Sequence, residues 1–363
     1  MVIAVYGANG YQAKLILAEL SRHDEEVRLV GRDQQRLDVA AVQVGIPDAD
    51  RRVAGADDHA ALVAALTGSD VVINCAGPFT VSGAAVVAAA IEARVHYVDT
   101  AGEQSYVKSI FDTFADDAER AGVTVVPATN DGCLPGDLLA HLVAEQTGPL
   151  AEITVSHLIT GGGGPSRGSL RSALATIDAM TAGGLTYHDG LWRTGVAARH
   201  EAIVLPDGAS VAMAALPLCE VITIPRHVRV DHVESLVEAT LQARLATPVT
   251  AELIDSLPEG PTDGDRAVQH FTYLLDATDH HGIQTRGVIR GVDTYGTTAV
   301  VAVEAARRLA AGNAAAGVLT PAQAFDPADL LATLSEHGLG WTIQTTSTSV
   351  SADNGTDRST RSR

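Results

Sequence analysis

The sequence is poor in lysine, cysteine and aromatic residues, and it carries a large excess of acidic residues. Its 363 residues include only two lysines, Lys14 and Lys108, and 25 Lys and Arg stand against 44 Asp and Glu. The formal net charge of −19 argues against a nucleic-acid partner, because phosphate binding requires a basic surface. The three cysteines are far apart and form no CxxC pair, so neither a disulfide framework nor a cysteine zinc site is expected.

Long hydrophobic runs and metal-ligand spacings are also missing. No apolar run reaches the 18 or more residues that suggest a membrane span. The N-terminus has no basic leader and reads at once as a strand, so no signal or transit peptide is expected. The histidines show no HExxH or similar spacing, so no metal is expected. We therefore expect a soluble cytoplasmic protein of about two domains that binds neither membrane nor nucleic acid.

What the first 130 residues contain is one repeated pattern: a short β-branched run, a turn, and a helical segment rich in alanine and leucine. This alternation predicts βαβ units and a doubly wound parallel sheet, a Rossmann domain over residues 1–130. Strands such as "DVVINCAG" are apolar on both faces, as expected when helices cover both sides. The expected strands are 2–6, 27–30, 51–54, 71–75, 95–98 and 123–127.

Residues 131–343 show a different pattern of strand-like and helical segments. Long alternating strands with only a few helices predict an α+β domain on a mainly antiparallel sheet. The segment "EVITIP" is expected to be one of these strands, and "TTAVVAVEAARRLAAG" is strongly helical. The polar, Ser/Thr-rich tail, 344–363, is expected to be disordered. Because such sheets often pair across a two-fold axis, a homodimer is one expectation for the assembly.

The turn after the first strand has the spacing Gly7-x-x-Gly10-x-x-Ala13. The first glycine allows a sharp turn, the second lets the backbone approach a pyrophosphate, and the alanine lets the helix pack closely. A plain βα turn is the alternative, but the first strand-turn-helix is where a dinucleotide cradle belongs. Amides at the helix start would face the phosphates. The residues expected to hold the cofactor here are Gly7, Asn9, Gly10, Tyr11 and Gln12.

The end of the second strand, "VRLVGRD", favours one cofactor over another. Gly31 stands where an NAD-specific protein usually has an acid for the ribose 2′-hydroxyl. Arg32 can instead pair with a 2′-phosphate, and Arg36 can add to it from the following helix. Asp33 could still serve an NAD ribose. The sequence therefore favours NADP(H) over NAD(H).

Several stretches together resemble the saccharopine dehydrogenase-like NAD(P)-dependent oxidoreductases, a group that includes saccharopine reductases and trans-acting enoyl reductases. The resemblance runs from residue 5 to about 327. It implies an N-terminal Rossmann domain, a C-terminal domain used for substrate and dimerisation, and a late helix, about 297–311, that packs back on the first domain. The matching stretches include "VYGANGYQAK", "LVGRDQQRL", "VVINCAGPF", "HYVDTAGE", "PGDLLAHLVAE" and "GPSRGSLRSAL".

In a doubly wound sheet, ligands bind outside the carboxyl ends of the strands. The loops after the fourth, fifth and sixth strands should therefore frame the nicotinamide and the substrate. Pro78 and Gly102 could equally be plain turn residues. We expect the cofactor to contact Cys75, Ala76, Gly77, Pro78 and Gly102, and the substrate to contact Phe79 and Asn130.

A reductase also needs a proton donor, and the sequence leaves its identity open. The family often has a Gly-x-Asp-x-x-Pro pattern, but "TNDGCLPGDL" here has Gly132 at the aspartate position and Asp131 one place earlier. A catalytic aspartate is therefore not carried over from the resemblance. The candidate donors are Tyr97, Asp99, Glu103, Asp131 and His227; Asp99 could also cap a helix.

The segment "GGGGPSRGSLRS" has two interpretations. Its glycines could form a mobile lid, with Arg167 or Arg171 clamping a substrate carboxylate. It could equally be a flexible connection with solvated arginines.

Together these features predict an NADPH-dependent reductase of an imine or an activated alkene in a small metabolite, for example in secondary metabolism. A non-catalytic NADP(H) sensor and a redox-neutral cyclase are the alternatives, because a fold alone does not fix chemistry.

Overall fold

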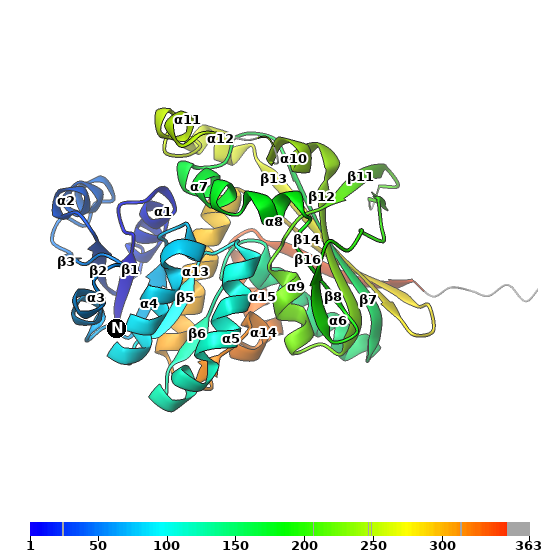
Figure 1. Ribbon diagram of the computed structural model, residues 1–363, viewed down its shortest axis with the longest axis horizontal. Helices are drawn as coiled ribbons and strands as arrows, with labels where there is room; N and C mark the ends of the chain where they lie inside the picture. Colours follow the sequence, from blue (N-terminus) through cyan, green and yellow to red (C-terminus); the bar gives the residue numbers. More distant parts are fainter. Residues whose placement is uncertain (24, 206, 246, 248, 313, 347–363) are drawn as a thin grey trace, which may run out of the picture.

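The computed structural model describes residues 1–346 apart from 24, 206, 246, 248 and 313, and these form two sheets with their helices (Figure 1). The first sheet lies on the left of Figure 1 and the second on the right. No helix in the described part of the chain is long and apolar enough to cross a membrane.

The first sheet is parallel, with the strand order β15-β6-β5-β4-β1-β2-β3. The strands β1 to β6 begin and end within one residue of the predicted bounds. The order 3-2-1-4-5-6 confirms the predicted doubly wound Rossmann sheet. Its strands are β1 (Val2–Tyr6), β2 (Glu26–Gly31), β3 (Asp50–Val53), β4 (Val71–Asn74), β5 (His96–Asp99), β6 (Thr124–Val126) and β15 (Gly317–Val318).

Helices bury both faces of this sheet, which is why its strands are apolar throughout. Ile3 and Val5 of β1 belong to one buried cluster with α1 and α13, while Ala4 and Tyr6 belong to another with α3, α4 and α5. The helices concerned are α1 (Tyr11–Leu20), α2 (Gln34–Gln43), α3 (His59–Leu66), α4 (Phe79–Ala93), α5 (Gln104–Ala121) and α13 (Thr294–Ala310).

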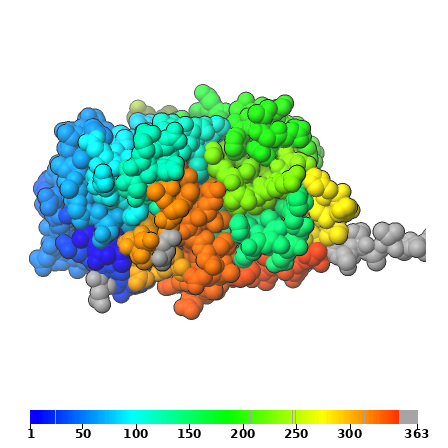
Figure 2. Space-filling view, turned by 90° about the horizontal axis from the view of Figure 1, so that it is seen from below, coloured from blue at the N-terminus to red at the C-terminus, as the bar shows by residue number. Residues whose placement is uncertain are grey.

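Two late elements, the helix α13 and the strand β15, belong with the first sheet, although most strands of the second sheet precede them in the chain. Helix α13 packs against α1, β4 and β5, and β15 pairs with β6. Arg307 of α13 also donates from Nε to Oε1 of Glu25 at 2.8 Å. Figure 2 shows this late segment, in orange, between the blue-cyan and green parts of the molecule. The first domain therefore consists of more than residues 1–130.

The second sheet has the order β10-β11-β12-β7-β13-β14-β16, with the β8–β9 hairpin attached to β12. Only the β12–β7 pair is parallel among the described pairs, which confirms the predicted mainly antiparallel sheet. Helix α6 (Cys133–Thr147) packs on it through Leu138 and Leu139. The strands are β7 (Leu150–Thr160), β8 (Leu185–His188), β9 (Leu191–Thr194), β10 (Ala202–Val204), β11 (Ser210–Ala215), β12 (Val230–Glu238), β13 (His270–Asp279), β14 (Gln284–Val292) and β16 (Gly340–Thr346).

The segment "EVITIP" is helical, so the strand expected there was wrong. It forms α9 (Glu220–Thr223) and the 3-10 turn η1 (Ile224–Arg226). Val221 and Ile222 are fully buried and α9 packs against α5 and α6, so tertiary packing overrides the local β-propensity. The remaining helices are α7 (Arg167–Ala175), α8 (Ile177–Thr181), α10 (Ala239–Leu245), α11 (Ala251–Ser256), α12 (Asp263–Ala267), α14 (Pro321–Ala324) and α15 (Pro327–Glu336).

The first three residues of the tail that was expected to be disordered from residue 344 are part of a strand. Residues 344–346 belong to β16, which pairs with β14, and 347–363 lie outside the described residues.

Candidate active site

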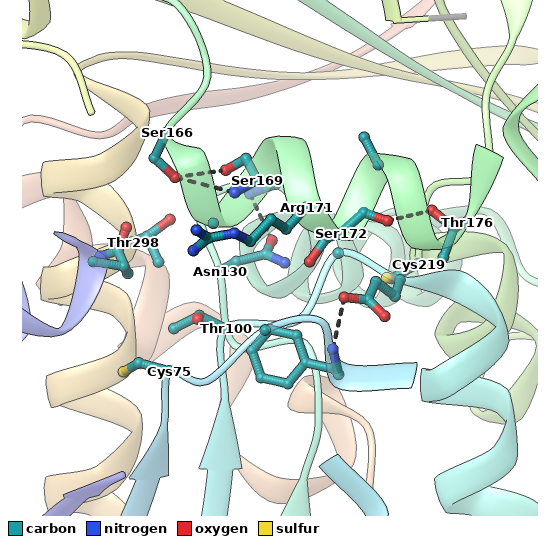
Figure 3. A pocket seen from close by; sticks show the side chains of 18 of the residues that line it. Cys75, Thr100, Asn130, Ser166, Ser169, Arg171, Ser172, Thr176, Cys219 and Thr298 are labelled. Carbon is teal, nitrogen blue, oxygen red and sulfur yellow. Dashed lines mark hydrogen bonds between the residues drawn. The ribbon is translucent and has the colours of Figure 1, made fainter. Parts of the chain in front are cut away.

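A cavity of about 980 Å³ lies where the carboxyl ends of the first sheet meet the second domain. This is the place where doubly wound sheets bind ligands. Figure 3 shows it between helix α7 and the loops of the first sheet that carry Cys75, Thr100 and Asn130. Thr298 of α13 and Cys219 close two of its sides.

The glycine turn after β1 forms one end of the cavity and has the shape of a dinucleotide cradle. Gly7 has a φ of +75°, and a Cβ there would lie 2.9 Å from the Cβ of Ala76. Gly10 directly precedes α1 and supplies no side-chain cap, and no acid stands in the first turn of the helix. The amides of Tyr11 and Gln12 are thus left for a ligand, with the positive end of the helix dipole behind them. Gly7, Asn9, Gly10, Tyr11 and Gln12 all line the cavity.

The end of β2 provides positive charge at the same end of the cavity. Arg32 and Arg36 both line it, beside Gly31. The carboxylate of Asp33 accepts from the amide of Arg36 at 3.1 Å and so caps α2. With the acid used as a cap and two guanidinium groups lining the cavity, the residues present fit a 2′-phosphate.

Arg32→Ala is expected to raise the KM for NADPH roughly 10- to 100-fold, because a charge-assisted hydrogen bond is worth about 1.5–3 kcal/mol. The KM for NADH should stay unchanged, since NADH has no 2′-phosphate. Steady-state kinetics with both cofactors check this, with Arg120→Ala, a surface residue paired with Asp117, as the control. An unchanged preference for NADPH in the Arg32 variant would contradict the assignment.

The loop after β4 borders the next part of the cavity. Cys75, Ala76 and Gly77 line it, as does Gly102 after β5, whereas Pro78 is not part of the described lining. Glu103 also lines it, but its carboxylate accepts hydrogen bonds from the amides that begin α4, Phe79 at 2.7 Å and Thr80 at 2.6 Å. Glu103 therefore acts as a helix cap.

Tyr97 and Asp99 lie in a buried network beneath the cavity and are not part of its described lining. Asp99 accepts from Tyr97 at 2.9 Å, from Tyr106 at 2.8 Å and from the amide of Ala128 at 2.8 Å. Burial raises the pKa of Asp99 to about 6, although these hydrogen bonds oppose the rise. The network ties β5 to the loop after β6, which is a structural role.

The structure does not bring His227 to the cavity lining that it describes. Its Nε2 lies 2.8 Å from Oδ1 of buried Asp137, and its Nδ1 lies 3.2 Å from Nδ1 of His141. Burial alone would raise the pKa of Asp137, but His227 and the amide of Ala322 hold it below its ordinary value. This pair joins α6 to η1 and α14.

A polar cluster of five residues forms the inner wall of the cavity, and only Asp131 was predicted from sequence. Tyr273 donates to Oδ2 of Asp131, and Thr298 donates to Oδ1 at 3.0 Å. Burial raises the pKa of Asp131, although Tyr273 and His157 oppose the rise. Burial and the nearby Asp131 raise the pKa of Tyr273 well above its ordinary value. We call Asp131, Thr298, Tyr273, His157 and Glu220 the Asp131 cluster; all five line the cavity.

The shifted aspartate in "TNDG" has a structural consequence. A Cβ at Gly132 would lie 2.6 Å from Cε1 of His157, so the glycine leaves room for the histidine ring. That ring stacks on Tyr273 with centroids 3.8 Å apart, since the two residues are partners on β7 and β13. His157 stands in "EITVSHLIT", where a histidine inside a predicted strand was the available signal for a site.

Helix α7 and the segment before α12 close the cavity over the cradle. Arg167 and Arg171 line it, and Arg171 pairs with Asp255. Tyr11 donates to the carbonyl of Pro261 at 2.6 Å, and Lys14 pairs with Glu259. The glycine run before α7 is packed: a Cβ at Gly161 would lie 2.1 Å from the carbonyl oxygen of Val268.

Comparison with known proteins identifies the first domain. Residues 3–126 match the family of saccharopine dehydrogenase NADP binding domains. Residues 3–126 are thus similar to this family. The match confirms the resemblance inferred from the motifs and the prediction of NADP(H) as the cofactor. The second domain lies outside the matched residues.

Among curated proteins, the chain is similar to trans-acting enoyl reductases of mycobacteria. It is 31% identical over 159 residues to that of Mycobacterium ulcerans, which is 41% of this chain and 38% of that protein. It is 29% identical over 185 residues to a putative one of Mycobacterium tuberculosis, 48% of this chain and 44% of that protein. The chain thus spans less than half the length of these relatives.

Among solved structures, the apo saccharopine dehydrogenase (L-Glu forming) of Saccharomyces cerevisiae superposes with a TM-score of 0.62 at 13% identity. The match covers 95% of this chain and 99% of that one. At this identity the likeness shows a shared fold, and it confirms the predicted fold class, a parallel Rossmann sheet with a second, mainly antiparallel sheet.

Proposed function

We propose that this protein is an NADPH-dependent reductase that saturates an activated C=C bond of a small metabolite, for example in secondary metabolism. The observation that carries the proposal is a single cavity of about 980 Å³ lined both by the dinucleotide cradle and by the Asp131 cluster. A reductase needs a cofactor site and buried titratable groups that face the same substrate. The enoyl reductases among the relatives support a C=C bond over a C=N bond as the acceptor.

The residues of the first domain fit NADP(H), which supplies a hydride when bound. Gly7, Gly10 and the amides of Tyr11 and Gln12 would hold the pyrophosphate. Arg32 and Arg36 would hold the 2′-phosphate. Cys75, Ala76, Gly77 and Gly102 would border the nicotinamide and its ribose, as their place at the ends of β4 and β5 supports.

The substrate would lie between the first domain and α7. Phe79 supplies an apolar wall, and Arg167 and Arg171 would bind an anionic group of the substrate. Asn130 also lines the cavity, and its Nδ2 donates to the carbonyl of Ala101 at 2.7 Å. Its Oδ1 accepts from the amides of Gly132 and Cys133, so all of these bonds fix the loop that carries Asp131.

Incubating the protein with NADPH and a panel of α,β-unsaturated thioesters and ketones tests the proposal. We expect loss of NADPH absorbance together with a product two hydrogen atoms heavier than the acceptor, measured by mass spectrometry. The panel also contains cyclic imines. Reduction of imines but of no alkene would reject the C=C assignment and leave an imine reductase.

Two further results would reject a reductase altogether. Tight NADPH binding without turnover of any acceptor would indicate a sensor, and product formation without net NADPH consumption would indicate a redox-neutral cyclase. The cytoplasmic location and the homodimer stay predictions; light scattering of the purified protein tests the second.

A further inference from the structure

Two side chains of the Asp131 cluster, His157 and Glu220, form a buried hydrogen-bonded pair at the cavity wall. Nε2 of His157 lies 2.7 Å from Oε1 of Glu220. The Glu220 side chain is 1% exposed and that of His157 is 10% exposed. The orientation of the His157 ring is fixed as well, because the ring stacks on Tyr273 and lies over Gly132. A carboxylate that binds one imidazole nitrogen sets the tautomer and stabilises the protonated ring.

The second nitrogen of this ring is left for the cavity. Nδ1 of His157 has no hydrogen-bond partner within the described residues, and it is not fully enclosed by protein. His157 lines the cavity, and we infer that this accessible nitrogen faces it. The arrangement has the form of a base or acid held by a third group on its far side.

The other candidate donors in the cavity are already engaged. Both oxygens of Asp131 accept hydrogen bonds, from Tyr273 and Thr298. The Tyr273 hydroxyl is used in donating to Asp131, and the Glu103 carboxylate caps α4. His157 is thus the cluster member with a free nitrogen and a partner that favours its charged form.

We propose that His157 is the proton donor of the reductase and that Glu220 positions its ring. This rests on the proposed function. Bound NADPH would supply the hydride for one end of the substrate double bond and would be left as NADP⁺, while the proton on Nδ1 of the imidazolium forms the C–H bond at the other end. The π pair of the double bond becomes the new C–H bond at the protonated carbon. His157 is left neutral, with its remaining proton on Nε2 towards Glu220, and regains a proton from water.

The chain supplies a matched control for this pair. His227 also binds a buried carboxylate, Asp137, at 2.8 Å, but it lies outside the described lining of the cavity. His157→Asn and His227→Asn each remove one buried imidazole–carboxylate pair, so both should lower the melting temperature. Only the first should change the chemistry.

We expect His157→Asn to lower kcat about 100-fold or more, the usual contribution of a general acid, with the Kd for NADPH unchanged. Glu220→Gln should move the alkaline limb of the kcat/KM–pH profile to lower pH, because a neutral amide no longer stabilises the imidazolium. Asp131 and Tyr273 are the other titratable groups that face this ring, so Asp131→Asn is measured beside them. His227→Asn should keep the wild-type profile.

A second readout needs no turnover. In ¹⁵N NMR of the protein without cofactor, the chemical shifts of the His157 ring nitrogens should differ between Glu220→Gln and the wild type, because the group that fixes the tautomer at Nε2 has changed. Wild-type turnover and pH profile in His157→Asn, or loss of the alkaline limb only in Asp131→Asn, would overturn the assignment while leaving the reductase intact. Absence of turnover in the wild type with every acceptor would instead overturn the proposed function, and the donor assignment with it.

Discussion

Gly7→Ala is expected to weaken NADPH binding at least about 100-fold, the equivalent of losing two charge-assisted hydrogen bonds to phosphate. The new Cβ would lie 2.9 Å from the Cβ and 3.1 Å from the backbone nitrogen of Ala76, so neither side can yield without moving backbone. Gly7 also donates from its amide to the carbonyl of Val30 at 2.9 Å, which ties the turn after β1 to the neighbouring strand β2. Any shift therefore displaces the amides of Tyr11 and Gln12 from the cradle.

Gly45→Ala is the matched control. Gly45 has a φ of +80°, close to the +75° of Gly7, but nothing lies within 4 Å of its added Cβ. Both variants should lose about 1–2 kcal/mol of stability to the left-handed backbone, while only Gly7→Ala should lose the cofactor. Fluorescence titration with NADPH and urea denaturation separate the two effects. Equal NADPH affinities in the two variants would show that the turn is no cradle.

The cradle could be predicted from the sequence because its geometry is local. The spacing of Gly7 and Gly10 sets a turn and a helix start, and both follow from backbone conformation within a few residues. The same holds for Arg32, one residue past the end of β2. All three residues line the cavity.

The Asp131 cluster could not be predicted in the same way, because it depends on long-range pairing. His157 and Tyr273 meet only through the register of β7 and β13, which are more than a hundred residues apart in the chain. Glu220 stands in a segment whose β-branched residues favour a strand, yet burial makes it a helix. Thr298 reaches the cavity because α13 returns to the first sheet.

His227 is a residue that the sequence suggests for catalysis but that the fold places away from the cavity lining. A histidine between a proline-containing turn and a strand looks like a proton donor in sequence, but its place in the fold is set by the Asp137 carboxylate buried beneath it. A buried imidazole–carboxylate pair and a catalytic one share the same chemistry, so only the position relative to the cavity separates them.

His227→Ala is therefore expected to destabilise the protein by about 3 kcal/mol, because it leaves the Asp137 carboxylate buried without the hydrogen bond of His227. His59→Ala is the control: His59 also pairs with a carboxylate, Glu92 at 2.8 Å, but their side chains are 50% and 62% exposed. A surface pair of this kind contributes about 0–1 kcal/mol. Urea denaturation of both variants and the wild type measures the difference.

The effect of His227→Ala should also depend on pH in a defined direction. The folded-state pKa of Asp137 lies below its ordinary value of 3.8, so its contribution to stability is fully present above that value. This contribution is lost as the pH falls through the folded-state pKa of Asp137, since a protonated carboxyl is no longer a buried charge. The gap in unfolding free energy between wild type and variant should therefore narrow below about pH 4. Turnover per folded molecule should stay at the wild-type level in His227→Ala. A fall in kcat without a fall in stability would instead indicate that His227 takes part in catalysis.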